Sequence, residues 1–374
     1  MDTPRSAHIN LDHAATTRPE PAVVEAVSRC MLDWDANPSA AYSDAGAARR
    51  VLREAREVFS AMLTCTPQEL YFTSCGTESN NWALHQAAGK HVVLSAMEHK
   101  SVLLAAEAQG CNISLVPPKP DGTVSPEAVE RALRADTALL SVQFANNETG
   151  VLQPVAELGA LAKSRGIPFH CDAVQALGHV PIDVESCHID MLSASAHKLY
   201  GPRGVGLLYI RAGVACLPFL AGGGQERDLR GGTENTPGIH GFRVAAELAN
   251  DDMANRAKRE SDLRELLTAE LVHRVPGAVE LCAHSPRLPG IVSVLLPGLS
   301  GEEVIAALDL QGIRVSGGAA CAARSGRPSH VLRALGLSEE QAGRVIRLSL
   351  GRHTTREEVL TAATAIAGLF HPQI

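Results

Sequence analysis

Between about residues 70 and 210 the chain alternates short apolar segments with helix-like segments, and each apolar segment ends in polar residues. The apolar segments are continuous runs rather than strict alternations of apolar and polar residues, which is typical of strands buried on both faces of a sheet. The predicted strands are 70–73, 91–95, 112–116, 139–144, 167–171 and 189–192. This pattern predicts an α/β fold with a mostly parallel sheet between helices.

The chain is too long for a single core. At 374 residues it exceeds the size at which one hydrophobic core keeps growing, so two domains are expected. From about Met253 the pattern changes to a charged helix followed by the short strands Val279–Leu281 and Ile291–Leu295. This change predicts a smaller α+β domain in the C-terminal third of the chain.

Composition excludes several functional classes. A net charge of −7 and an aromatic content of 3% argue against a nucleic-acid surface and against base-stacking platforms. No apolar run approaches the roughly 18 residues of a membrane span, and the first residues lead into no signal-peptide core. The nine cysteines include no CxxC pair, so neither a disulfide framework nor a zinc site is signalled. We expect a cytoplasmic protein that binds no metal, no membrane and no nucleic acid directly.

Residues able to do chemistry follow several predicted strands. Lys198 comes after a run of Ser and Ala residues, Asp172 directly follows strand 167–171, and His99 lies just past strand 91–95. Because the carboxyl ends of parallel strands meet at one edge of a sheet, the acid and the amine predict a shared site. A lone histidine at such a place is more often a surface or capping residue, and the pair Asn146-Asn147 can simply form a turn.

The transition after strand 70–73 is a candidate phosphate site. The strand continues through Ser74 and Gly76 into a helix that opens with Thr77. Free backbone N–H groups at the positive end of a helix dipole favour a phosphate. The alternative is an ordinary strand-to-helix turn in which Ser74 or Thr77 is the N-cap.

Each of three further segments allows a functional and a structural interpretation. Cys321 lies among Gly, Ala and Ser residues near Arg324 and Arg327, whose positive charges would favour a reactive thiolate, or it is an incidental small residue of a loop. Arg347 on a short C-terminal strand could bind a substrate carboxylate or be a surface charge. The glycine-rich segment before Thr233 is a binding loop or a flexible linker.

Together these features match the needs of pyridoxal phosphate, which takes a Schiff-base lysine, an acid for its ring nitrogen and a phosphate anchor. Seven strings, which span nearly the whole chain, resemble those of the cysteine desulfurases of the class V aminotransferase family, in the same order. They are LDHAATT from Leu11, FTSCGTESNN from Phe72, EHK from Glu98, NNETG from Asn146, DAVQ from Asp172, HKLYGPRG from His197 and GTEN from Gly232. The resemblance is to the nitrogen-fixation and iron–sulfur type.

The resemblance implies the fold called type I among pyridoxal-phosphate enzymes. A large cofactor-binding domain over residues 12–253 would contain a mainly parallel seven-stranded sheet between helices. Residues 1–11 and 254–374 would form a smaller α+β domain that carries the Cys321 loop. The chain would act as a homodimer.

The resemblance also implies a role for each matching residue around pyridoxal 5′-phosphate. Lys198, Cys321 and His99 would be catalytic: Lys198 forms the Schiff base, His99 stacks on the ring and moves protons, and Cys321 receives the sulfur. The remaining cofactor contacts would be Asp172 at the ring nitrogen, Gln175 at the ring oxygen, Gly76, Thr77, Ser195 and His197 at the phosphate, and the partner subunit's Thr233 at the same phosphate. Asn147 and Arg347 would contact the carboxylate of the substrate.

The implied reaction converts L-cysteine to L-alanine and leaves a persulfide on Cys321, which donates its sulfur to an acceptor protein, as in iron–sulfur cluster assembly. The chain departs from the family at Cys75, Gly76 and Ala196, but no functional side chain is lost. It stops at Ile374 without the C-terminal extension of housekeeping members, so a different or dedicated acceptor is expected. A selenocysteine lyase or an aminotransferase would share the cofactor residues without needing Cys321, and a non-catalytic interaction protein is the third alternative.

Overall fold

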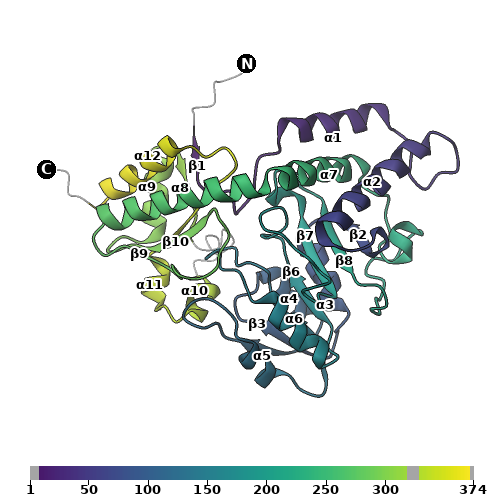
Figure 1. Ribbon diagram of the computed structural model, residues 1–374, viewed down its shortest axis with the longest axis horizontal. Helices are drawn as coiled ribbons and strands as arrows, with labels where there is room; N and C mark the ends of the chain where they lie inside the picture. The colour runs from purple at the N-terminus through teal and green to yellow at the C-terminus, as the bar shows by residue number, and fades with distance from the viewer. Residues whose placement is uncertain (1–7, 318–327, 371–374) are drawn as a thin grey trace.

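The computed structural model describes residues 8–317 and 328–370 (Figure 1). A seven-stranded sheet dominates the part of the chain before α8 and confirms the predicted α/β architecture. Its strand order is β2 (Leu70–Thr73), β8 (Gly206–Ile210), β7 (Met191–Ser195), β6 (Phe169–Asp172), β5 (Thr137–Ser141), β3 (His91–Ser95) and β4 (Asn112–Val116). Only β8 runs against its neighbours, since it pairs antiparallel with both β2 and β7.

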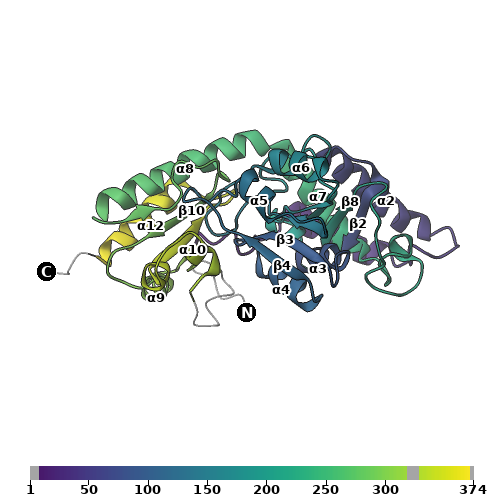
Figure 2. The ribbon, with the colours of Figure 1, turned by 90° about the horizontal axis from the view of Figure 1, so that it is seen from below.

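Helices cover both faces of this sheet. Alternate residues of β2 enter different cores: Phe72 joins a cluster that includes Phe59 and Phe242, whereas Tyr71 joins one that includes Trp82. Side chains alternate between the faces of a strand, so the two clusters lie on opposite faces. Figure 2 shows α2 (Ala45–Leu63), α6 (Val155–Ser164) and α7 (Thr236–Asp251) on one side and α3 (Gly76–His85) and α4 (Lys100–Ala108) on the other.

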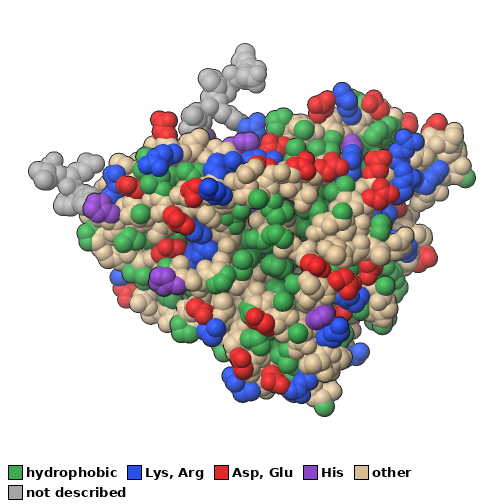
Figure 3. All heavy atoms as spheres, in the orientation of Figure 1, with side chains coloured by type: hydrophobic (Ala, Val, Ile, Leu, Met, Phe, Trp, Pro, Cys, Tyr) green, Lys and Arg blue, Asp and Glu red, His purple; other side chains and the backbone are tan. Residues whose placement is uncertain are grey.

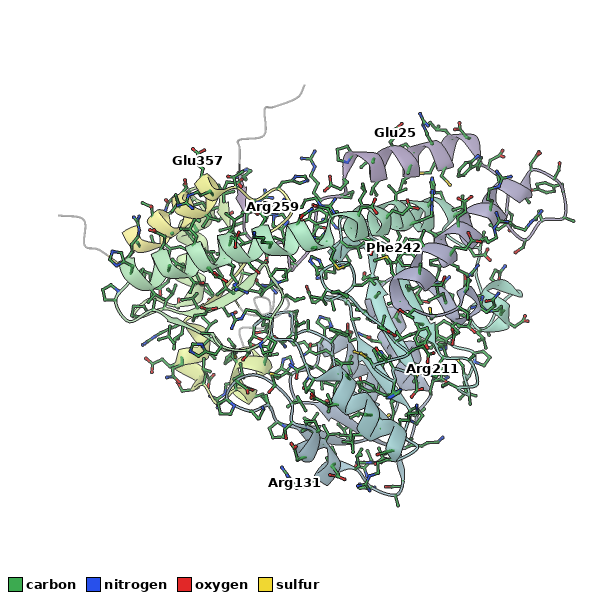
Figure 4. All side chains as sticks on the ribbon, in the orientation of Figure 1. Glu25, Arg131, Arg211, Phe242, Arg259 and Glu357 are labelled. Carbon is green, nitrogen blue, oxygen red and sulfur yellow. The ribbon has the colours of Figure 1, made fainter. Side chains whose placement is uncertain are left out.

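Aromatic contacts fix the outer helices of the first cluster. Phe242, labelled on α7 in Figure 4, packs against Phe59 of α2 with ring centroids 4.4 Å apart. Helix α1 (Pro21–Asp33) lies along α7, and α5 (Pro126–Ala132) connects β4 to β5. Helix α1 starts at Pro21, and the fixed φ of proline suits the first turn of a helix.

Three predicted strands are displaced along the sequence. Strands expected over 139–144, 167–171 and 189–192 occupy 137–141, 169–172 and 191–195. A row of buried polar groups inside the sheet explains why the last of these strands continues past Leu192. His170 Nδ1 and Nε2 lie 2.8 and 3.0 Å from the hydroxyl oxygens of Ser141 and Ser193, so these serines can occupy buried strand positions at little cost.

The C-terminal part builds a second core around an antiparallel sheet of order β12–β10–β9. Its strands are β9 (Val279–Glu280), β10 (Ile291–Leu295) and β12 (Val345–Ser349), and its helices are α8 (Met253–Arg274), α9 (Gly301–Asp309), α10 (His330–Ala334), α11 (Glu339–Gly343) and α12 (Arg356–Gly368). The strings SGEE from Ser300, SEEQ from Ser338 and TREE from Thr355 predict capping boxes, and the structure confirms them at the starts of α9, α11 and α12. Figure 1 shows these elements, green to yellow, on one side of the large sheet.

The N-terminal segment crosses to this second core. Strand β1 (Ile9–Asn10) pairs in parallel with β11 (Ile313–Arg314), a pairing that sequence reasoning missed. Leu11 is fully buried in the same cluster as Val292 and Leu348. The division at residues 12–253 stays a prediction, and the second cluster is the structural feature that supports it.

None of the helices within residues 8–317 and 328–370 combines the length and the apolar character that a bilayer crossing requires. On the face drawn in Figure 3, basic and acidic side chains are interspersed.

Candidate active site

A cavity of about 260 Å³ lies at the carboxyl ends of β3, β5, β6 and β7, where α/β folds hold their ligands. It collects ten of the twelve predicted site residues from across the chain. These are Gly76, Thr77, His99, Asn147, Asp172, Gln175, Ser195, His197, Lys198 and Arg347. The other two are Thr233, which is exposed and outside this cavity, and Cys321, which lies outside the described residues.

Lys198 ends a one-turn 3₁₀ helix, Ala196–Lys198, that follows β7. Its Nζ donates to the carbonyl oxygens of Ala14 and Ala15 at 2.6 and 2.8 Å. Its own carbonyl oxygen accepts from His179 Nε2 at 3.0 Å. Burial lowers the pKa of His179 to about 4, so at neutral pH this ring is uncharged and carries its proton on Nε2.

Asp172 ends β6 with both carboxylate oxygens engaged. Oδ1 accepts from the Val174 N–H at 2.9 Å, and Oδ2 accepts from Asn80 Nδ2 at 2.7 Å. The same Asn80 amide donates to Ser101 Oγ at 2.8 Å. These bonds fix the plane of the carboxylate, so its remaining acceptor capacity can serve one more donor.

Asn80 was not predicted as a site residue, although it was part of the quoted helix start. Its position four residues after Gly76 places it on the same face of α3, one turn further along, and this was a usable signal. Ser101 and Gln143 also line the cavity and were missed, because nothing local in the sequence links them to Asp172.

His99 is both a helix cap and a cavity residue, so the two readings of the sequence coexist. Its Nδ1 accepts from the Ser101 N–H at 3.1 Å as the N-cap of α4. An accepting Nδ1 leaves the proton on Nε2 in the neutral ring. Burial lowers the pKa of His99, and the charge of Asp172 opposes this shift only in part. The ring is therefore neutral at pH 7, and its Nε2 carries the proton.

The phosphate end of the cavity is the start of α3. The N-cap is Cys75, with no side-chain cap, so the alternative of a turn capped by Ser74 or Thr77 is wrong. A Cβ added to Gly76 would lie 2.6 Å from Val174 Cγ2 and 3.5 Å from Ser195 Cβ, so only glycine allows this close approach. Ser195 Oγ is buried and has no partner within the described residues. Uncapped amides beside an unpaired hydroxyl suit a phosphate.

His197 lies next to this end. Its Nδ1 is 3.1 Å from Thr16 Oγ1. Burial lowers the pKa of His197 to about 4, and the positive charges of Lys198 and Arg203 add to the shift. A nearby anion would oppose that shift.

Residues of the N-terminal segment contact both Arg347 and Gln175. Arg347 is 1% exposed, so the reading as a surface charge is wrong. Its Nη2 pairs with Asp12 Oδ1 and its Nη1 donates to the Asn147 carbonyl, both at 2.7 Å, while its buried Nε has no partner within the described residues. Gln175 Nε2 donates to the Ala14 carbonyl at 3.0 Å.

Asn146 and Asn147 lie in different surroundings. Asn146 Oδ1 accepts from the N–H groups of Glu148 and Thr149 at 2.9 and 2.8 Å, so this residue is a turn former, as one reading proposed. Asn147 lines the cavity. The interpretation as a turn therefore holds for Asn146, and a contact of Asn147 with the substrate carboxylate stays a prediction.

The residues on either side of the Cys321 segment are anchored beside the cavity. The backbones of Ser316 and Arg347 exchange two hydrogen bonds, at 2.7 and 3.1 Å. Ser329 Oγ donates to Glu148 Oε2 at 2.6 Å, and burial raises the pKa of Glu148. The chain therefore leaves and re-enters the described region close to Arg347 and Asn147.

These residues fit pyridoxal phosphate on structural grounds. The glycine cradle at Gly76 and the unpaired Ser195 hydroxyl suit the phosphate group, and Asp172 is an oriented carboxylate that can hold a protonated ring nitrogen. Lys198 brings an amine to the same cavity.

Comparison with known proteins agrees with this chemistry. The Aminotransferase class-V family profile matches residues 9–361. A curated relative, "Cysteine desulfurase IscS" of Clostridium botulinum, is 41% identical over 94% of this chain and 91% of its own length. The solved structure of a "NifS-like protein" is 35% identical with a TM-score of 0.90, covering 97% of this chain and 99% of its own. A structure titled "SspA in complex with cysteine" is 34% identical, with a TM-score of 0.82 over 93% of this chain and 100% of its own.

Proposed function

The chain belongs to the aminotransferase class-V family and is a pyridoxal-phosphate-dependent cysteine desulfurase, and from this premise we propose how its own residues divide the reaction. The products proposed are L-alanine and a persulfide on Cys321. The observation that carries the assignment of residues is the meeting of Lys198, Asp172 and the uncapped start of α3 around one cavity.

The bound cofactor supplies an electron sink for negative charge that develops on the substrate carbon. Asp172, oriented by Asn80 and the Val174 amide, holds the proton on the ring nitrogen. Gly76, Thr77, Ser195 and His197 hold the phosphate. Lys198 forms the covalent link, and once released its Nζ is a base within the same cavity.

We assign substrate binding to the cavity residues nearest the second core. Arg347 presents a buried Nε that has no partner within the described residues, and charge-assisted bonds from a guanidinium are among the strongest available to a carboxylate. Asn147 lies beside it in the cavity. His99 is neutral at pH 7 with its proton on Nε2, so Nε2 is the atom that can give up a proton and take it back.

Sulfur transfer is assigned to Cys321 through the resemblance of the sequence. Its thiolate sulfur bonds to the substrate sulfur while the Cβ–S bond breaks. The electron pair of that bond stays with carbon, which takes up a proton and becomes the methyl group of alanine. The anchors at Ser316 and Ser329 support the assignment, since they hold both ends of this segment near the cavity.

We also propose a cytoplasmic homodimer that passes its sulfur to an acceptor protein, with iron–sulfur cluster assembly as the first pathway to test. In the dimer the partner subunit's Thr233 would reach the phosphate. Thr233 is exposed in this chain, and its loop is tied to α3 by an ion pair between Arg230 Nε and Glu78 Oε1 at 2.8 Å. This placement supports a role outside the chain's own cavity.

The test is the reaction of purified protein with L-cysteine. Wild type should form alanine and a protein persulfide in equal amounts, and Cys321→Ser should form neither while it keeps the absorbance of the bound cofactor. Cys111→Ser, a half-buried thiol at the edge strand β4, is the matched control and should react like wild type. Full alanine production by Cys321→Ser would contradict the proposed sulfur transfer.

A further inference from the structure

Tyr200, two residues after Lys198, has a left-handed backbone with φ of 66°. This conformation costs free energy for any residue with a Cβ, and more so for a bulky one. It persists only where the surroundings determine it, and such residues concentrate at functional sites. Tyr200 is 3% exposed, so its surroundings are the protein itself.

The backbone N–H and the hydroxyl group of Tyr200 are bonded to distant parts of the chain. Its N–H donates to Thr17 Oγ1 at 2.7 Å, and its hydroxyl oxygen accepts from the Arg352 N–H at 2.5 Å. The Arg352 guanidinium carbon also lies 5.3 Å from the centre of the tyrosine ring. A Cβ on Gly351 would lie 2.6 Å from the tyrosine hydroxyl and from the His13 ring, so only glycine permits this contact.

The segment that holds Tyr200 is itself fixed between two long helices. The Arg352 carbonyl accepts from Arg259 Nη2 of α8 at 2.8 Å, and Arg352 Nη2 donates to the Leu248 carbonyl of α7 at 3.0 Å. Arg352 Nη1 lies 3.4 Å from Glu20 Oε1. Figure 4 shows Arg259 on α8, close to the end of α7. Residues 351–352 are therefore a rigid support rather than a loose loop.

His179 holds the same stretch from the other side. Its Nε2 donates to the Lys198 carbonyl at 3.0 Å, and the neutral ring needs no counter-ion there. The main chain of Lys198 is thus bonded directly at its carbonyl and constrained two residues later at Tyr200. A side chain works in a fixed place only when its backbone and supporting groups are fixed.

We propose that Tyr200 and His179 form a clamp that positions Lys198, and that Gly351 and Arg352 transmit the position of the C-terminal core to it. Both are positioning residues, because neither lines the cofactor cavity. The proposal rests on the proposed function in one respect, namely that Lys198 carries the cofactor. It adds that the C-terminal core takes part in aligning the lysine, in addition to binding substrate through Arg347.

The test compares two buried tyrosines that each lose one hydroxyl. Tyr200→Phe leaves the Arg352 N–H unpaired and should slow the displacement of Lys198 by L-cysteine about tenfold, as followed by stopped-flow absorbance. It should also lower the fraction of chains in which borohydride fixes the cofactor on Lys198 without substrate. Tyr209→Phe is the control: this hydroxyl on β8 is buried without a partner in the described chain, and both readouts should stay within about twofold of wild type.

A glycine pair supplies a second, independent variant. Gly351→Ala forces a shift of His13 or Tyr200 and should reproduce both effects, whereas Gly343→Ala has no neighbour within 4 Å and should not. Wild-type rates and trapping in both Tyr200→Phe and Gly351→Ala would overturn the clamp, as would loss of folding in both, which would mark a purely structural role. If borohydride fixes no cofactor on Lys198 of the wild type, the proposed function of Lys198 fails and the clamp fails with it.

Discussion

The two ends of the cavity differ in how their polar groups are satisfied. At the phosphate end, α3 starts without a side-chain cap and the buried Ser195 hydroxyl has no partner among the described residues. At the lysine end, Lys198 Nζ donates to Ala14 and Ala15 and its carbonyl accepts from His179. Buried polar groups in a folded protein are normally paired, and the unpaired Ser195 hydroxyl lines the cavity, so it is available to a ligand. The phosphate end therefore suits a ligand, whereas the lysine end fixes the position of Lys198.

Removal of the lysine amine should have the largest effect. Lys198→Ala loses both the covalent link and the base, and alanine formation should fall by roughly 10²–10⁴-fold or more. The absorbance of the covalently linked cofactor should vanish with it. Lys90→Ala, an exposed lysine at the amino end of β3, should change neither quantity. Persistence of the band in Lys198→Ala would move the link to another residue.

Asp172→Asn tests the centre of the cavity, between the two ends. The amide oxygen can keep the bond from the Val174 N–H, but the amide NH2 cannot accept from Asn80 Nδ2, and the charge that faces the ring nitrogen is lost. Loss of one partner of a buried charged pair should weaken cofactor binding by about 2–5 kcal/mol, measured as a dissociation constant by titration of the apoprotein. Asp190→Asn is matched, because Asp190 also accepts a backbone N–H, that of Phe169, at the opposite ends of the strands. Equal losses in both variants would contradict the role of Asp172.

Gly76→Ala tests the phosphate end alone. The new Cβ would lie 2.6 Å from Val174 Cγ2, so either the start of α3 or Val174 must shift. Overpacking of this kind costs about 1–3 kcal/mol, which should appear as weaker cofactor binding with the rate at saturating cofactor largely kept. Gly46→Ala on α2 has no neighbour within 4 Å and serves as control. A fall in the saturated rate without a change in affinity would show that the two ends are not separable.

The sequence was most informative where a signal is local. Apolar runs predicted the strands, capping boxes predicted the starts of α9, α11 and α12, and strand ends indicated where Lys198 and Asp172 meet. The end of the strand predicted over 189–192 was wrong at Ser193, because the bond of this serine to His170 makes it acceptable inside a sheet. A propensity argument cannot foresee a partner on another strand.

Contacts between distant segments could not be predicted at all. The β1–β11 pairing, the bond of Asn80 to Asp172 and the bond of Ser329 to Glu148 each join residues that are far apart in the chain. The left-handed backbone conformation of Tyr200 could not be predicted either, since it depends on the contact with Arg352. These contacts orient the side chains of the site, whereas local sequence patterns indicate only which residues belong to it.

Acidification should give the smallest of the effects that distinguish the two ends, a loss of folding stability at low pH. Burial lowers the pKa of His197 at the phosphate end and of His179 at the lysine end to about 4 in each case. Both lie below the value of about 6.5 in an unfolded chain, so the unfolded chain binds more protons and stability is lost as pH falls from 6.5 toward 4. For His179 the loss by pH 5 should be about 2 kcal/mol.

A bound phosphate group should cancel this loss at one end only. Its negative charge raises the pKa of His197 toward the unfolded value but does not reach the hydrogen-bonded ring of His179. Urea unfolding at pH 7 and pH 5 measures how much the free energy of unfolding decreases on acidification. For His179→Asn this decrease should be smaller than in wild type with or without cofactor. For His197→Asn it should be smaller than in wild type only without cofactor. An identical response of both variants to cofactor would mean that His197 does not face the phosphate, and the contrast between a binding end and a holding end would then rest on α3 and Ser195 alone.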